Sequence, residues 1–143
     1  MNLTKELLKI TTFLGLIFGV VALVPYTIFY VLVALFLLSS ICSILYYRKL
    51  TKFELTDYKT TMITGGVLGF ASFVGFIVVF IPCVLVLSFI FKSYYNYGIP
   101  YLLNFQAIWL FILIIIVVAI VCASTNAVSL MALQYFDILR KGK

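Results

Sequence analysis

The chain has 143 residues and a formal net charge of +6; 66% of its residues are hydrophobic, 10% are charged, and its mean hydropathy is +1.28. Soluble domains carry roughly 25% charged residues, so this composition excludes an ordinary soluble protein and indicates an integral membrane protein. The positive charge does not indicate nucleic-acid binding, because no basic run is longer than two residues and no soluble module remains to present one.

Two apolar blocks in the first third of the chain meet at Pro25. A single helix over residues 10–47 would be about 57 Å long at a rise of 1.5 Å per residue, which is too long for a hydrocarbon core of roughly 30 Å. We therefore expect two spans, at residues 8–24 and 26–47, joined by a tight turn. A basic start before a short apolar run is also typical of a signal peptide, but a second apolar block follows at once, so we expect the segment to be retained.

The rest of the chain predicts two further spans. Residues 48–60 are hydrophilic and should form a loop at the membrane surface, before a third span at residues 61–91. This span contains Pro82, which predicts a kink because proline removes a backbone hydrogen bond. An aromatic segment at residues 92–104 should form the outer loop, and the fourth span should cover residues 105–129. The sequence thus predicts an all-α fold, a single-domain four-helix membrane bundle of two helical hairpins over residues 1–143.

Basic residues predict the orientation of this bundle. With four spans, both termini and the central loop share one side, and that side holds nine of the ten basic residues: Lys5, Lys9, Arg48, Lys49, Lys52, Lys59, Arg140, Lys141 and Lys143. Positive charge marks the cytoplasmic side, so we expect both termini in the cytoplasm, with a bacterial inner membrane as the location. The loop residues Arg48, Lys49, Lys52 and Lys59 are the candidates for contact with lipid headgroups.

Small residues form stripes on the predicted spans. Transmembrane helices associate closely where side chains are small, so we expect helix packing or partner contacts at Gly15, Gly19, Gly65, Gly69, Ser72, Ala119, Ala123 and Asn126. At 100° per residue, Gly69 lies at the centre of its stripe and Gly75 at the edge. We therefore expect Gly69→Leu to be more damaging than Gly75→Leu, and we expect the stripe of the third span to meet that of the fourth.

Small and hydroxyl residues gather in the predicted cytoplasmic half of each span, and large aromatic and aliphatic residues in the outer half. Two interpretations fit this asymmetry. The helices pack closely at the cytoplasmic end and splay outward, or they enclose a polar vestibule lined by Ser43, Ser72, Thr125 and Asn126. An unpaired amide in lipid costs several kcal/mol, so Asn126 needs a partner on a neighbouring span or on another protein.

The residues needed for most membrane chemistry are missing. The chain has no His, and its three cysteines, Cys42, Cys83 and Cys122, are widely spaced in apolar blocks. This pattern favours free thiols and predicts no metal and no cofactor. No carboxylate is needed inside any predicted span, which argues against coupled transport. The chain resembles small multidrug transporters in length and span count, but those proteins rely on a membrane carboxylate in the first span, which this chain lacks.

Three functional hypotheses remain. The first is a non-catalytic accessory subunit or assembly factor of a larger membrane complex, with the lipid bilayer and that complex, or a homo-oligomer, as partners. The second is a channel, holin-like pore or uncoupled carrier, which requires an oligomer because four helices leave little room for a pore. The third is a lipid- or polyprenyl-handling protein whose basic loop meets anionic headgroups. No enzymatic activity is expected.

Overall fold

The computed structural model describes residues 2–24, 27–50, 57–90 and 107–142. These residues form five helices: α1 (Asn2–Val21), α2 (Ile28–Leu37), α3 (Ser39–Leu50), α4 (Tyr58–Ile90) and α6 (Ile108–Lys141). The all-helical prediction is therefore confirmed for the described part of the chain. The predicted outer loop at residues 92–104 lies outside it, as do Lys52 and Pro25.

Long apolar helices indicate a membrane protein. Within the described residues, α4 and α6 are each long and apolar enough to cross a membrane, and α2 with α3 makes a third crossing if this bent pair is one span. A helix needs about 20 residues to cross the hydrocarbon core, and α4 has 33 and α6 has 34.

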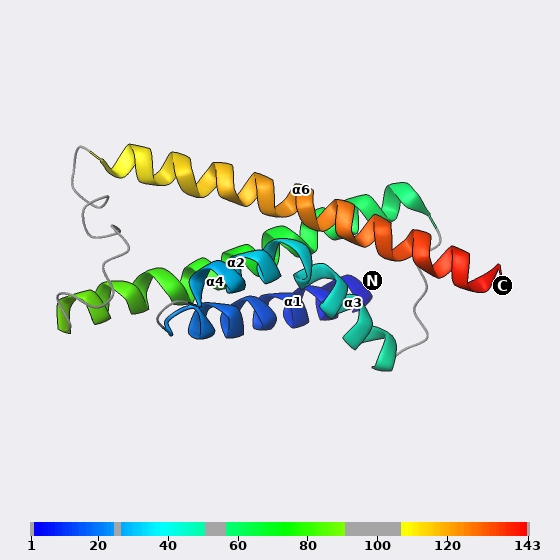
Figure 1. The fold of residues 1–143 in the computed structure, drawn as a ribbon, viewed down its shortest axis with the longest axis horizontal. Helices are drawn as coiled ribbons and strands as arrows, with labels where there is room; N and C mark the ends of the chain where they lie inside the picture. The colour runs from blue at the N-terminus through cyan, green and yellow to red at the C-terminus, as the bar shows by residue number, and fades with distance from the viewer. Residues whose placement is uncertain (1, 25–26, 51–56, 91–106, 143) are drawn as a thin grey trace.

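Helix α4 lies between α1 and α6, and the glycine contacts give the helix directions. On one side of α4, Ser72 lies beside Gly15 and Val79 beside Gly19, so α1 and α4 run parallel. On the other side, Gly65 lies beside Ala127, so α4 and α6 run antiparallel. Figure 1 shows that both chain termini lie toward the same end of the molecule. We call this the near end and the opposite one the far end.

The second apolar block is not one helix. It breaks at Leu38, and α2 and α3 meet there at an angle of 61°. The span predicted over residues 26–47 stays a prediction, and the bend within it at Leu38 is not predicted from the sequence. Sharp kinks occur at proline, glycine or serine pairs, or where a side chain inserts into the helical hydrogen bonds, and here Ser39 and Ser40 follow the break directly. Pro82, in contrast, lies inside α4 without ending that helix, and the kink expected there stays a prediction.

Helix boundaries differ from the prediction at two further places. The last helix continues to Lys141 rather than stopping near residue 129, because Leu130 and Gln134 keep a buried face on it. Helix α1 ends at Val21, where the Thr27 hydroxyl lies 2.9 Å from the Val21 carbonyl oxygen and 2.6 Å from that of Val24. The Thr27 hydroxyl therefore caps the Val21 carbonyl, one of those that the end of α1 leaves without helical donors.

Two apolar clusters fill the interior. The far cluster joins α1, α2, α4 and α6 through Ala22, Val31, Leu35, Phe73, Phe76, Phe80, Val84, Ala119 and Cys122. The near cluster consists of Leu7, Ile44, Tyr47, Leu68 and Leu130. On α6, Asn126 falls between Cys122 of one cluster and Leu130 of the other, and Ser39 and Ser40 fall likewise between Leu35 and Ile44. The two clusters are therefore separated by a polar layer.

Candidate functional site: a polar junction and an apolar groove

The polar layer is built around the Asn126 amide, whose residue is fully buried (0% exposed). The amide nitrogen donates to the Leu35 carbonyl at 3.1 Å and to the Cys122 carbonyl at 2.9 Å. The amide oxygen accepts from the Ser40 backbone N–H at 3.1 Å and from the Ser39 hydroxyl at 2.8 Å. Of the two kinds of partner expected for Asn126, a neighbouring span or another protein, the structure shows partners within the chain, on α2 and α3.

These hydrogen bonds explain how the break at Leu38 is tolerated in an apolar environment. In a continuous helix the carbonyl of residue 35 and the N–H of residue 40 would each bond to backbone. Here the Asn126 amide supplies a donor to the Leu35 carbonyl and an acceptor to the Ser40 N–H. The amide thus takes the place of a missing peptide group and supplies a hydrogen-bond partner on each side of the break. Without partners, backbone polar groups buried in a membrane are costly.

Serine hydroxyls and a thiol extend this junction to α4. The Ser72 hydroxyl lies 3.0 Å from the Ser39 hydroxyl oxygen and 2.9 Å from the Gly69 carbonyl oxygen. The Cys122 thiol lies 3.5 Å from the same Gly69 carbonyl. We use the name polar junction for Ser39, Ser40, Ser72, Cys122 and Asn126. It connects α3, α4 and α6 and leaves none of these side chains facing the surroundings.

The glycines of α4 and α1 bring the helices close enough for this junction. A Cβ atom built on Gly69 would lie 2.7 Å from the Asn126 Cβ, and one on Gly65 would lie 2.8 Å from the Ala127 Cα. Gly15 lies against the Ser72 carbonyl, and a Cβ on Gly19 would lie 3.0 Å from the Phe76 carbonyl oxygen. Each is a backbone contact that no larger side chain could occupy without moving a helix.

Other residues expected to pack helices are placed less tightly. Ala119 is buried in the far cluster. Ala123 is only half-buried, and its carbonyl oxygen is 3.9 Å from the Cβ position at Gly66. The face that α6 turns to α4 therefore runs through Cys122 and Ala127, neither of which the sequence analysis placed in the stripe. Cys122 lies four residues before Asn126 and Ala127 directly follows it, so both adjoin the predicted stripe at Asn126.

Gly75 does not lie at the edge of a contact face. A Cβ atom built there would come within 2.6 Å of the Thr12 carbonyl oxygen on α1. Helix α4 has two close faces, one toward α6 and one toward α1, and Gly75 belongs to the second. The expectation that leucine is better tolerated at Gly75 than at Gly69 therefore loses its basis.

The basic residues of the described ranges lie toward the near end. Arg48 on α3 forms an ion pair with Asp137 on α6, with 2.7 Å between the guanidinium nitrogen and the carboxylate oxygen. Lys49 and Lys59 are exposed. Arg48 thus connects two helices as well as adding charge to this end. Within the described residues no group of three or more His, Cys, Asp or Glu side chains could hold a metal ion.

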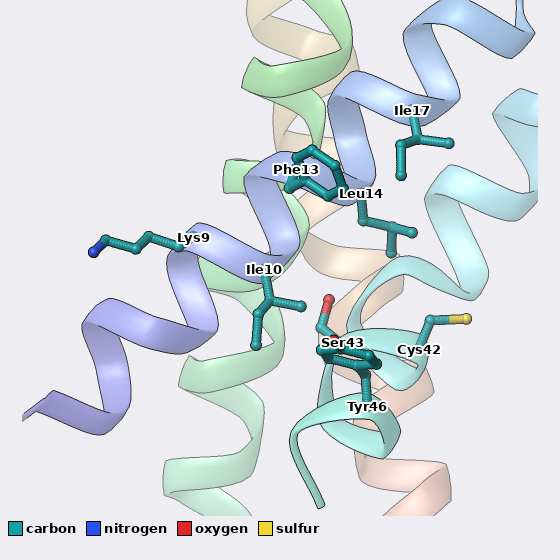
Figure 2. A pocket seen from close by; sticks show the side chains of 8 residues that line it. All are labelled: Lys9, Ile10, Phe13, Leu14, Ile17, Cys42, Ser43 and Tyr46. Atoms are coloured by element: carbon teal, nitrogen blue, oxygen red, sulfur yellow. The ribbon is translucent and has the colours of Figure 1, made fainter. Parts of the chain in front are cut away.

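A groove of about 550 Å³ opens between α1 and α3, close to the polar junction. Its walls are formed by Lys9, Ile10, Phe13, Leu14, Ile17, Cys42, Ser43 and Tyr46. Figure 2 shows the α1 side chains Ile10, Leu14 and Ile17 opposite α3, while the Lys9 ammonium extends away from the groove. Ser43 is the one serine in the walls, and its hydroxyl already donates to the Ser39 carbonyl at 2.8 Å.

A second and smaller groove, of about 280 Å³, lies between α4 and the far half of α6. All its lining residues are apolar, among them Phe73, Ile77 and Ile116.

Comparisons of the chain with protein families, with curated proteins and with solved structures find no match. A functional assignment therefore rests on the geometry of the chain itself.

Proposed function

We propose that the protein is a non-catalytic integral membrane protein that serves as an accessory subunit of a larger membrane complex. In this proposal α1, the bent pair α2–α3, α4 and α6 are four spans of one bundle. Support comes from the helix directions, because α1 runs parallel to α4 and antiparallel to α6, as alternating crossings require. It also comes from the charges, because Arg48 lies beside Asp137 of α6, close to Arg140 and Lys141 at the C-terminal end.

The orientation in this proposal follows from the same charges. The near end, with the described basic residues of both termini and of the α3–α4 connection, faces the cytoplasm under the positive-inside rule. Exposed aromatic residues lie at both ends of the described spans, Trp109 and Phe89 at the far end and Tyr58 and Tyr135 at the near end. Aromatic residues at both ends are typical of helices that reach both membrane interfaces. A bacterial inner membrane is the proposed location.

The far half of α6 is the observation that carries the proposed subunit role. In the most apolar stretch of α4, 33% of the residues are buried, against 11% in that of α6. Large side chains are exposed over most of the circumference of this half, including Trp109, Leu113 and Val117, while Phe111, Ile115 and Val118 pack against the far cluster. A helix that is apolar on all sides is normally surrounded by protein or lipid, and the groove beside α4 gives it a shaped surface. We assign this surface to the apolar side chains of a partner protein rather than to a close contact between helix backbones.

The polar junction argues against the pore hypothesis. A vestibule needs polar side chains that face water, but Ser43, Ser72 and Asn126 are buried and each bonds within the protein. Thr125 is half-buried and bonds to carbonyls of its own helix. The hydroxyl and amide groups thus bond within the protein, and their burial favours helix packing over a polar vestibule.

Site-specific photo-crosslinking in native membranes tests the proposed role. A photoreactive residue at Ile112, in the far half of α6, should give one discrete adduct with another membrane protein, and the same protein should co-purify in gentle detergent. Val128, exposed at the near half of α6, provides the matched control and should not give that adduct. An adduct at twice the mass of the chain would instead indicate a homo-oligomer. Lipid adducts alone at both positions, with nothing co-purifying, would refute the subunit role.

A further inference from the structure

The groove between α1 and α3 is a direct consequence of the break at Leu38. Helix α1 is held against α4 by Gly15 and Gly19. Helix α3 departs from the line of α2 by 61° and is fixed to α6 by Ser40 at one end and Arg48 at the other. Because α1 follows α4 while α3 follows α6, the space between α1 and α3 is left unfilled. The groove is therefore built by the same contacts that define the fold.

We propose that this groove binds an anionic lipid, with an acyl chain between α1 and α3 and the headgroup on Lys9. The proposal rests on the membrane location proposed above but not on the subunit role. Phe13, Ile17 and Tyr46 line the groove and are all strongly exposed, so the groove opens to the surroundings and not to the interior. In a bilayer its apolar walls would be in contact with acyl chains.

The positive charge at the near end of the groove favours a lipid with a negatively charged headgroup. Lys9 is the one charged residue among those that line it, and its ammonium extends away from the apolar walls (Figure 2). The ion pair between Arg48 and Asp137 is the one found within the described ranges, so neither Glu6 nor another described carboxylate pairs with Lys9. Lysine side chains can extend along apolar surface and place the ammonium at headgroup level. The exposed ring of Tyr46, which also lines the groove, is of the type that lies at this level.

The walls favour a lipid over a helix. Helices that pack in a membrane approach through small residues, as α4 does through Gly65 and Gly69. The α1–α3 groove is instead lined by branched and aromatic side chains such as Ile10, Phe13 and Tyr46. These side chains would hold a helix backbone at a distance, whereas a flexible acyl chain can fill the space between them and gain many small dispersion contacts.

Photoactivatable lipids provide the test. The full chain is reconstituted in phosphatidylcholine nanodiscs that contain a minor fraction of phosphatidylglycerol with a diazirine on its acyl chain, or of phosphatidylcholine labelled in the same way. Adducts are then located by mass spectrometry. We expect the phosphatidylglycerol adducts to concentrate on residues 10–17 and 42–46. Cys42→Trp, which fills the groove from an exposed position, should remove them. Leu45→Trp, on the same helix but outside the groove lining, should not.

A charge variant tests the headgroup assignment. Lys9→Gln should lower the preference for phosphatidylglycerol over phosphatidylcholine about fivefold, the factor expected from one basic residue at an anionic surface. Lys59→Gln, an exposed basic residue outside the groove lining, should leave the preference unchanged. Adducts spread evenly over α4 and α6, adducts unaffected by Cys42→Trp, or crosslinks from the groove to a second copy of the chain would each overturn the proposal. If alkaline carbonate extracted the protein from vesicles, the membrane location itself would fail.

Discussion

The two halves of α6 differ in how they are held. The near half contacts α4 at backbone distance through Gly65 and Gly69, and its Asn126 amide bonds to both sides of the α2–α3 break. The far half carries large exposed side chains and borders an apolar groove beside α4, and it contacts the far cluster through side chains such as Phe111 and Ile115. Figure 1 shows α4 and α6 diverging toward the far end. Small and polar residues therefore fix the near half of this helix, while the bulky apolar residues of the far half leave much of its surface exposed.

The difference also shows that splaying is confined to one helix. In the far half, α1, α2 and α4 remain packed together through Ala22, Val31, Phe76 and Phe80. Outward splaying is one of the two interpretations of the sequence, and Figure 1 shows such a divergence for α6 relative to α4. If the subunit proposal is right, the part of the bundle that stands apart is the part that meets the partner.

The largest expected effect comes from placing a side chain in the close contact between α4 and the near half of α6. Gly69→Leu would place a branched side chain where even a Cβ lies 2.9 Å from the Cys122 carbonyl oxygen. We expect it to destabilise the fold at the upper end of the roughly 1–3 kcal/mol typical of overpacking, or beyond it, as a loss of folded yield and of thermal stability in mild detergent. Gly75→Leu should act in the same way through α1. Val67→Leu, on an exposed position of α4, is the control and should be nearly neutral.

Two buried amides on α6 allow a sharper comparison. Asn126→Leu removes the partners of the Leu35 carbonyl and the Ser40 N–H, and each buried unpaired group costs about 1–3 kcal/mol. We therefore expect a loss of roughly 2 kcal/mol or more in the free energy of unfolding. Both amide atoms of Gln134 are buried without a hydrogen-bond partner, so Gln134→Leu should be neutral or stabilising. Equal losses from the two variants in denaturant unfolding would contradict the role given to Asn126.

The smallest effect is expected at the Arg48–Asp137 ion pair. Its side chains are 23% and 33% exposed, and pairs that reach water contribute less than about 1 kcal/mol. Asp137→Asn should lower the stability slightly, and the difference from wild type should shrink in high salt because mobile ions screen the charges. Lys49→Gln changes charge at the same end without breaking this pair and should have a smaller effect. A large loss of stability in Asp137→Asn that does not depend on salt would mean that the ion pair positions α3.

Several of these features could be predicted from the sequence, and others could not. The need for a partner at Asn126 follows from its chemistry in an apolar helix, and the close faces at Gly15 and Gly69 follow from their spacing. The break at Leu38 does not, because Leu37 and Leu38 favour a helix and the bonds that stabilise the break come from a residue far along the chain. Pro82 lies inside α4, as predicted for the third span, and the kink expected there stays a prediction. Local sequence cannot reveal which helix will supply the missing hydrogen bonds.

The difference between the halves of α6 can be measured most directly with spin labels on exposed positions of α4 and α6. Met62 and Val128 report on the near half, and Val86 and Leu110 on the far half; all four side chains are exposed. For the protein in nanodiscs, pulsed electron–electron double resonance should give a narrow distance distribution for the near pair and a broader one for the far pair. Distributions of equal width, or a broader one for the near pair, would contradict the conclusion that only the near half of α6 is fixed.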